Sequence, residues 1–323
     1  MPEVPPFPFI VGSGRCGSTL MRVMFDAHPD MAVPTELYFS LAPRAEWLTP
    51  DGSLIVDRVV ADLEARPWYP RMKLEPGAYR AAIAAEAPTD YADVIRSLYG
   101  VYAQAQGKPR YGNKSPGHVA SMPQLLALFP EAKFIHIVRD GRNVALSYME
   151  HNFGPSDLAG SAEAWRNRVM RGRRAGAKLG PDRYTEVRYE DLLDDPEGQL
   201  RRLCAFVDLP FNDAVLRYYE RVPNMVIGGG AHPKLSMPPT KGMRDWRAQM
   251  TPAQILLFES IAGDTLTSLH YEMSGLTPSR GDRLRIGMRK AVSDAPRKTR
   301  RRLRRTARWV RHRGQPAAET SGG

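Results

Sequence analysis

Short apolar runs alternate with amphipathic stretches along most of the chain. Phe7 to Val11 is apolar and follows several prolines, which predicts a buried strand. Residues 18–27 carry apolar side chains at helical spacing and end at His28-Pro29, which predicts a helix. Because a glycine-rich loop at 12–17 joins the two, the chain begins with a strand, a loop and a helix, the usual opening of an α/β sheet.

The same arrangement recurs in KFIHIVRDGRNVALSYMEH, with a predicted strand at 134–138 and a predicted helix at 143–150. A third strand is predicted at 184–189, ahead of the acidic turn EDLLDDP. The remaining predicted helices span 89–106, 117–128, 158–178 and 197–207. Alternating strands and helices are typical of α/β proteins, so we expect a P-loop-like parallel sheet flanked by helices on both faces.

The character of the chain changes after about Gly275, where apolar residues become rare and arginine dense. Residues 280–323 hold 15 of the 46 Lys and Arg but 3 of the 35 Asp and Glu, which leaves 31 basic and 32 acidic side chains in 1–279. The net charge of +11 therefore belongs to the end of the chain. We predict one domain over 1–275 and a basic, partly disordered tail over 276–323.

Composition is that of a soluble globular protein, with 42% hydrophobic and 25% charged residues. No run of about 18 apolar residues predicts a transmembrane helix, and the first residues lack the basic region of a signal peptide. Two cysteines, Cys16 and Cys204, make no disulfide framework. These features predict a cytoplasmic protein, with membrane-surface contact through the tail as one option.

The loop in FIVGSGRCGSTLM has the two glycines of a phosphate-binding loop, Gly12 and Gly17. Ser18 stands where a nucleotide-hydrolysing loop has lysine, and Thr19 follows it. The nest of N–H groups and the helix N-terminus remain, so an anion is expected at Gly17-Ser18-Thr19, with Arg15 supplying the charge. The loop alone does not separate phosphoryl from sulfuryl transfer.

The stretch FIVGSGRCGSTLMRVMFDAHPD resembles the 5′-phosphosulfate loop of sulfotransferases, above all that of the tyrosylprotein and bacterial branch. The resemblance implies transfer of a sulfuryl group from 3′-phosphoadenosine 5′-phosphosulfate (PAPS) to a hydroxyl, without a metal. It implies that the donor contacts the loop residues Gly14, Arg15, Cys16, Gly17, Ser18 and Thr19. Arg15 would meet the oxygen that bridges phosphorus and sulfur. Cys16, beside Arg15 and a helix N-terminus, is also considered as a reactive thiol.

A second constellation lies in VRDGRNVALS, where Arg139 ends a predicted strand and Ser147 follows in the next helix. A guanidinium fork and a hydroxyl can clamp one phosphate. The stretch resembles the family's 3′-phosphate motif, which assigns that contact to Arg139 and Ser147. Asp140 and Arg142 are expected to pair or cap instead.

Two residues are candidates for the chemistry at the hydroxyl. Glu36, 21 residues after Arg15 in PTELYF, is placed to return to the mouth of the loop. A hydroxyl nucleophile needs a proton acceptor, and the resemblance assigns that role to Glu36. Lys114 in RYGNKSPGHV could donate to sulfuryl oxygens, a role that the resemblance also assigns, although a solvated lysine beside a helix cap explains it as well.

A late segment, PPTKGMRDW, echoes one that closes over the 3′-phosphate in many cytosolic sulfotransferases. Lys241 is therefore a candidate donor contact, and Ser236 just before it is another. No histidine has metal-ligand spacing with cysteine or acid, so we expect no metal site.

The acceptor and the tail stay open. Tyrosylprotein enzymes carry an arginine two residues after the catalytic glutamate, whereas this chain has Tyr38 there, so a carbohydrate, lipid or small-metabolite hydroxyl is favoured. The tail could bind anionic lipid, bind nucleic acid without sequence preference, or have no partner. Two other classes remain: a P-loop small-molecule kinase, and an inactive sulfotransferase-like binding protein that uses its basic tail.

Overall fold

The computed structural model describes residues 4–150, 154–155, 157–221, 233–239, 244–283 and 287. The chain forms two compact units, Met1–Trp246 and Arg247–Gly323, and each is described by itself. The predicted domain boundary at 275/276 stays a prediction, and most of the basic tail lies outside the described residues.

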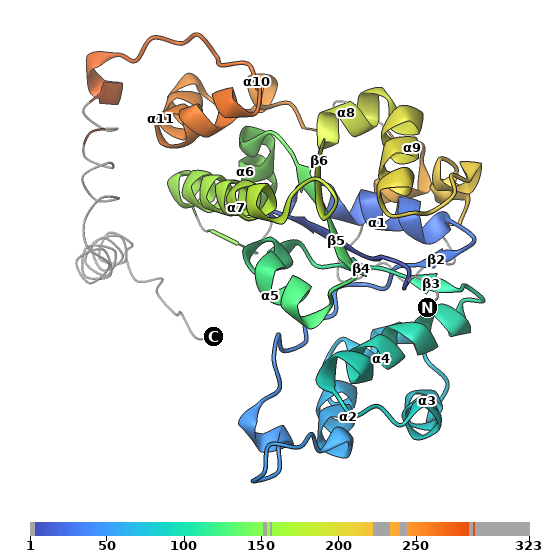
Figure 1. Cartoon of the computed structure of the whole chain (residues 1–323). Coiled ribbons are helices and arrows are strands. Elements are labelled where there is room, and N and C mark those ends of the chain that lie inside the picture. The colour runs from blue at the N-terminus through green and yellow to red at the C-terminus, as the bar shows by residue number, and fades with distance from the viewer. Residues whose placement is uncertain are drawn as a thin grey trace, which may run out of the picture. The chain divides into compact units, whose positions relative to one another are not determined.

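A parallel sheet with the strand order β4-β1-β5-β6 forms the centre of the first unit (Figure 1). The strands of the described chain are β1 (Phe7–Gly12), β2 (Met31–Ala32), β3 (Arg110–Tyr111), β4 (Asn113–Lys114), β5 (Ala132–Val138) and β6 (Tyr184–Arg188). Strands β2 and β3 pair separately, also in parallel. The predicted α/β class with a parallel sheet is confirmed.

Helices surround this sheet. The α-helices of the first unit are α1 (Ser18–Ala27), α2 (Val56–Glu64), α3 (Ala78–Glu86), α4 (Tyr91–Ala105), α5 (Met122–Leu128), α6 (Gly141–Glu150), α7 (Leu158–Leu179), α8 (Tyr189–Asp194) and α9 (Pro196–Phe206). The helix α10 (Trp246–Gln249) begins at the last residue of this unit, and α11 (Pro252–Ser268) belongs to the second.

Two apolar cores cover the two faces of the sheet, because side chains alternate along each strand. Phe7 and Phe9 of β1 pack with Phe134 of β5 and with the helices α2 to α5. Ile10 of β1 and Ile135 of β5 pack instead with α1, α8 and α9. The sheet is therefore the middle of three layers, as the predicted helices on both faces required.

Capping residues set where several helices begin. The Asp90, Asp157 and Asp195 carboxylates accept hydrogen bonds from backbone N–H groups in the first turns of α4, α7 and α9. In the second unit, Thr251 and Gln254 form a reciprocal capping box at the start of α11. Among the described residues, no helix is both long and apolar enough to cross a bilayer.

The structure corrects the prediction in three places. The expected acidic turn EDLLDDP is mostly the helix α8, because Leu192 is buried and the acidic side chains of its first turn favour a helix N-terminus. The helix predicted over 117–128 is a 3-10 turn, Pro116–Ala120, followed by α5, which restarts with Pro123 in its first turn. The helices α2, α3 and α11 and the two-residue strands β2, β3 and β4 were not predicted.

Candidate functional site

The candidate residues lie where the parallel strands end. The glycine loop follows β1, Lys114 is the last residue of β4, and Arg139 follows β5 directly. In a parallel sheet these carboxyl ends lie at one edge, and the register pairs Ile10 with Lys114 and Gly12 with Ile137. Ligands of open α/β sheets bind at this edge.

The glycine loop adopts a backbone that favours glycine. Gly14, Arg15 and Gly17 have φ angles of 80°, 54° and 97°. Gly17 is the N-cap of α1 and has no side chain that could cap it, so the first N–H groups of the helix are directed at the loop. An anion held there would meet N–H donors and the positive end of the helix dipole.

Three side chains that the sequence analysis missed surround this loop. The Tyr148 hydroxyl donates to the Ser13 carbonyl at 2.6 Å, and an Arg168 Nη1 donates to the same carbonyl at 2.9 Å. A Cβ added to Gly17 would lie 2.2 Å from the Tyr189 ring. Only the folded chain brings these residues to the loop, since Tyr148, Arg168 and Tyr189 lie on α6, α7 and α8.

Arg15 and Ser147, predicted at opposite ends of the donor, lie in contact. The Arg15 Nε donates to the Ser147 Oγ at 2.8 Å. Burial lowers the pKa of Arg15, and the charges of Arg244 and Arg139 lower it further. Tyr148 and Glu150 offset only part of this effect, so the three arginines favour an anionic ligand, because like charges repel.

Arg244 is the member of this cluster that the sequence analysis did not name, although it lies in the quoted segment PPTKGMRDW. Its Nη2 pairs with Glu150 at the end of α6. Lys241, the predicted contact in that segment, lies outside the described residues. Ser236 is exposed in a short 3-10 helix, and its contact with the donor stays a prediction.

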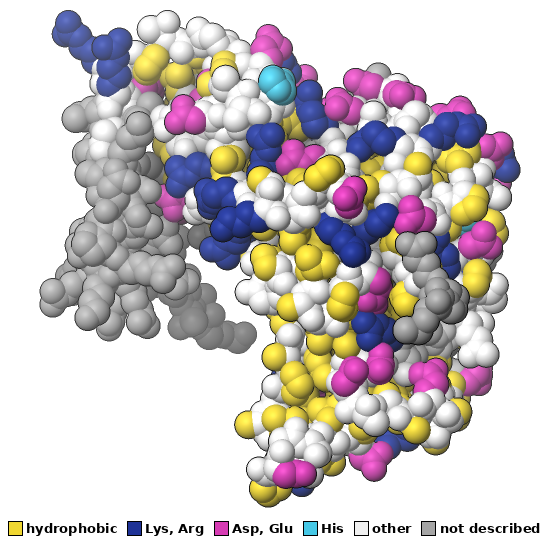
Figure 2. Space-filling model, viewed as in Figure 1, with side chains coloured by type: hydrophobic (Ala, Val, Ile, Leu, Met, Phe, Trp, Pro, Cys, Tyr) yellow, Lys and Arg dark blue, Asp and Glu magenta, His cyan; other side chains and the backbone are white. Residues whose placement is uncertain are grey.

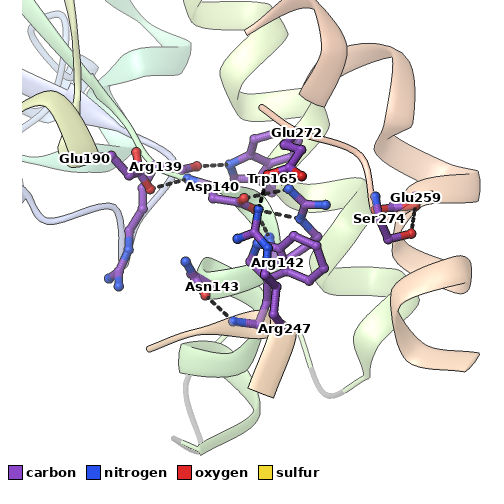
Figure 3. Close-up of polar contacts among 11 residues, drawn as sticks. Arg139, Asp140, Arg142, Asn143, Trp165, Glu190, Arg247, Glu259, Glu272 and Ser274 are labelled. Atoms are coloured by element: carbon purple, nitrogen blue, oxygen red, sulfur yellow. Dashed lines mark hydrogen bonds and ion pairs between the residues drawn. The ribbon is translucent and has the colours of Figure 1, made fainter. Parts of the chain in front are cut away.

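Side chains from two other helices bind the backbone at Arg139, and the guanidinium packs on the ring of Tyr189. Trp165 donates to the Arg139 carbonyl at 3.0 Å, and Glu190 accepts from the next peptide N–H (Figure 3). The guanidinium carbon lies 4.4 Å from the centre of the Tyr189 ring. The buried Arg139 Nε has no hydrogen-bond partner among the described residues, so it has a free donor for a phosphate.

Asp140 and Arg142 pair with each other, as predicted. The Asp140 carboxylate accepts from the Arg142 Nη2 at 2.8 Å and from its Nε at 3.0 Å (Figure 3). The Arg142 guanidinium lies 3.6 Å from the ring centre of Trp246, whose backbone N–H donates to the Asn143 Oδ1. This pair therefore anchors the segment around Arg244 to α6.

Glu36 and Lys114 form an ion pair. Lys114 is 2% exposed, whereas the Glu36 side chain is 28% exposed. Burial opposes ionisation of Glu36, but the charge and hydrogen bond of Lys114 outweigh it and lower the pKa of the carboxyl. Burial lowers the pKa of Lys114, and Glu36 partly offsets this effect. The carboxylate is consequently in the form that accepts a proton at neutral pH.

The residues after Glu36 are held by side-chain donors instead of by regular structure. Trp68 donates to the Tyr38 carbonyl at 3.2 Å, and Tyr91 donates to the Ser40 carbonyl at 2.8 Å. The Tyr38 side chain is 57% exposed, and burial and the Glu36 charge raise the pKa of its hydroxyl. An exposed aromatic ring thus lies within electrostatic reach of the Glu36 carboxylate.

Cys16 differs from one expectation. Its thiol is fully buried below the loop, and a Cβ added to Gly12 would lie 2.5 Å from its sulfur. Burial raises the pKa of the thiol, which argues against a reactive cysteine. Any donor contact from Cys16 would come through its backbone N–H.

The described residues contain no group of three or more His, Cys, Asp or Glu side chains placed to hold a metal ion. The predicted absence of a metal from the reaction stays a prediction.

Several known proteins have sequences similar to this chain. The sequence matches the profile described as the sulfotransferase family over residues 6–213. A protein-tyrosine sulfotransferase of Drosophila melanogaster is 29% identical over 68% of this chain and 42% of its own length. An omega-hydroxy-beta-dihydromenaquinone-9 sulfotransferase of Mycobacterium bovis is 30% identical over 62% of each protein.

A solved structure agrees with the fold. The sulfotransferase domain of the Synechococcus PCC 7002 olefin synthase matches with a TM-score of 0.55 and 29% identity, over 81% of this chain and 97% of that domain. The chain spans 42% to 57% of the length of the first three curated relatives. The matched region includes the glycine loop, Glu36, Lys114 and the Arg139 segment. The chain therefore belongs to the sulfotransferase family.

Proposed function

We propose that this protein transfers a sulfuryl group from PAPS to a hydroxyl of a carbohydrate, lipid or small-metabolite acceptor. One observation carries the proposal: Lys114, which pairs with Glu36, ends β4, and the glycine loop follows the neighbouring strand β1 at the same edge of the sheet. A proton acceptor, a cation and a phosphosulfate site are the parts that such a transfer requires.

The donor supplies the sulfuryl group and a good leaving group. The acceptor oxygen forms a bond to sulfur, and the bond from sulfur to the bridging oxygen breaks. The electron pair stays on the phosphate of adenosine 3′,5′-bisphosphate, and Glu36 takes the acceptor proton. Lys114 and Arg15 stabilise the negative charge that builds on the sulfuryl and bridging oxygens.

The residues present fit this donor. The loop N–H groups and the Ser18 and Thr19 hydroxyls suit the 5′-phosphate. Arg139, with an unpartnered buried Nε, suits the 3′-phosphate, and Ser147 lies beside the same cluster of arginines. The lowered pKa of Arg15 supports the same assignment, since a bound polyanion relieves the repulsion among Arg15, Arg139 and Arg244.

The surface near Glu36 favours an acceptor with apolar parts. Tyr38 is exposed, and Phe39 and Leu41 are partly buried against the core. Hydrophobic side chains gather over the lower part of the first unit, where the connection from β2 to α2 lies (Figure 2). A lipid or aromatic alcohol suits such a surface better than an acidic peptide does. The similarity to a menaquinone sulfotransferase points in the same direction.

Two alternatives make different predictions. A small-molecule kinase would bind ATP with Mg²⁺, and Ser18 at the lysine position argues against it. An inactive binding protein would not need the Glu36–Lys114 pair. Contact of the basic tail with a membrane surface stays a separate proposal, and the donor site predicts that deletion of 280–323 leaves donor binding intact.

Calorimetric titration tests the donor site without knowledge of the acceptor. Adenosine 3′,5′-bisphosphate without metal should bind the wild-type protein, bind far more weakly to Arg139→Ala, and bind normally to the control Arg201→Ala. Arg201 is a surface residue that pairs with Glu197. Binding of Mg·ATP alone would overturn the proposal in favour of the kinase. Transfer from PAPS to a panel of alcohols and phenols, followed by release of bisphosphate, then separates an enzyme from a binding protein.

A further inference from the structure

We propose that Arg22 and Asp26, on the buried side of α1, are positioning residues that fix Glu36 for the transfer. The inference rests on the proposed function, because it takes Glu36 as the proton acceptor. Neither residue is expected to touch donor or acceptor. They act through the backbone of the segment that carries Glu36.

The two side chains hold both backbone groups of Val33. The Val33 N–H donates to the Asp26 Oδ1 at 2.8 Å, and the Arg22 Nε donates to the Val33 carbonyl at 2.9 Å. Arg22 and Asp26 also pair with each other, one helical turn apart, at 3.4 Å. Val33 is thus fixed in position and in orientation by one face of one helix.

The chain between Val33 and Glu36 is short and stiff. Pro34 fixes its own φ angle and restricts the backbone of Val33. Pro34 and Thr35 are both buried, so their surroundings limit them further. A displacement of Val33 would therefore move Glu36 by a similar distance.

The network is buried, and its charges have a cost. Arg22 is 1% exposed and Asp26 is 7% exposed. Lys108, 8% exposed, donates to the carbonyls of Asp26 and Met31 and so ties the end of α1 to β2. A buried ion pair seldom stabilises a fold more than apolar side chains of the same volume would. Here the ion pair instead fixes the geometry of the segment that leads to Glu36.

The same helix carries the donor loop. α1 begins after Gly17, at the loop, and ends at Ala27, one residue beyond Asp26. Its ten residues span about 15 Å as a rigid rod. The anion site at its first turn and the clamp in its second half are therefore parts of one element. In this way α1 sets the position of the proton acceptor relative to the donor.

The charge of Arg22 has a second effect, on the pKa of Glu36, which can be measured separately. Glu36 faces Lys114 from β4, Arg22 from α1 and Tyr38 from its own segment. Burial raises the pKa of Glu36, whereas Lys114 and, to a smaller extent, Arg22 lower it. Arg22→Lys keeps the charge but loses the Nε donor to Val33. Asp26→Asn keeps an acceptor for the Val33 N–H but breaks the ion pair.

The test measures turnover, donor affinity and the Glu36 carboxyl in each variant. With p-nitrophenol as probe acceptor, kcat should fall about 10- to 100-fold in Arg22→Lys and Asp26→Asn, as misplaced reacting groups imply. The bisphosphate Kd should stay within about twofold, because the loop is unchanged. The control Arg96→Lys alters a partly exposed arginine of α4 that pairs with Glu131, and it should leave kcat and Kd unchanged.

Carbon-13 NMR of the Glu36 carboxyl, assigned by its loss in Glu36→Gln, supplies a readout that needs no acceptor. The proposal expects a changed Glu36 chemical shift in Arg22→Lys, although the charge is retained. An unchanged Glu36 signal, or kcat at the wild-type level in both variants, would overturn it. Full activity of Glu36→Gln would instead overturn the proposed role of Glu36, so the two failures are distinguishable. A parallel loss of donor affinity and kcat would indicate a general structural role and also reject the proposal.

Discussion

The Lys114 ammonium group and the Glu36 carboxylate pair across 78 residues of sequence, at the edge of the sheet where the glycine loop begins. Lys114 is the more deeply buried partner. It therefore favours the ionised form of Glu36, while the carboxylate remains partly exposed to solvent. The predictions that follow depend on this arrangement and on the loop beside it.

Glu36→Gln should lower kcat by about 10²- to 10⁴-fold, the usual effect of losing a general base. Donor affinity should be unchanged, since the proposed function assigns phosphate binding to other residues. Initial rates with PAPS and calorimetry with the bisphosphate check the two statements. Glu46→Gln, which changes a largely exposed glutamate, is the control and should have wild-type kinetics.

The ion pair of Glu36 with Lys114 determines how the rate should depend on pH. The pKa of Glu36 lies below its ordinary value of 4.5, so kcat/KM should be flat near neutral pH and fall only in more acidic solution. Lys114→Met removes the charge that lowers this pKa and leaves the burial that raises it. The acidic limb of the profile should therefore move to higher pH in that variant.

The same shift contributes to stability, and its sign can be stated. Because the folded-state pKa of Glu36 is lowered, its contribution to stability is present above the unfolded-state pKa and is lost as the pH falls through the folded-state value. Urea unfolding of wild type and Glu36→Gln should differ at neutral pH and converge in acid. A difference that grows toward acid would contradict the assignment.

Arg139→Ala should weaken bisphosphate binding about 10- to 100-fold, the value of a hydrogen bond between charged groups, roughly 1.5–3 kcal/mol. Arg139→Lys should recover part of the loss, because it restores charge but not the fork. Calorimetry with adenosine 5′-monophosphate adds a check. Adenosine 5′-monophosphate lacks the 3′-phosphate. If Arg139 contacts that phosphate, the wild type and Arg139→Ala should bind adenosine 5′-monophosphate equally well.

Gly17→Ala should abolish donor binding and lower stability, because the new Cβ would lie 2.2 Å from the Tyr189 ring at a φ of 97°. Gly52→Ala is a matched control, since Gly52 has a φ of 88° but no atom within 4 Å of a new Cβ. The control isolates the cost of the backbone conformation, about 1 kcal/mol. Thermal unfolding should rank Gly17→Ala clearly below Gly52→Ala.

Arg168→Ala and Tyr148→Phe should each weaken bisphosphate binding about 3- to 10-fold, because each removes a donor to the Ser13 carbonyl worth roughly 0.5–1.5 kcal/mol. The double variant should lose less than the product of the two single effects, since the side chains also contact each other at 3.0 Å. A strictly additive result would mean that the two side chains support the loop independently.

Local pattern was enough to predict β1, β5 and β6 of the central sheet, but not the two-residue strand β4. The helix over 18–27 matches α1 to the residue, because an apolar stripe and a closing His28-Pro29 define it. The strand at 134–138 and its helix are also recovered, within two residues. The acidic segment after Tyr189 was misjudged, because its helix depends on burial of Leu192 in the tertiary structure.

The site residues also fall into two groups, those that local motifs identify and those that only the folded chain brings together. Arg15, Arg139 and Ser147 could be named because loop and strand–helix motifs carry them. Tyr148 and Arg168 could not, since their role at Ser13 depends on how α6 and α7 pack. The pairing of Glu36 with Lys114 likewise required the register of β4 on β1.

The position of that pair in the sequence has a consequence for how new specificities could arise. Glu36 and Lys114 lie on either side of residues 37–113, a segment that includes the exposed Tyr38 and the helices α2, α3 and α4. The donor loop and Arg139 lie outside it. Under the proposed function, an exchange of residues 37–113 would change which hydroxyl is accepted and leave the donor loop and Arg139 in place.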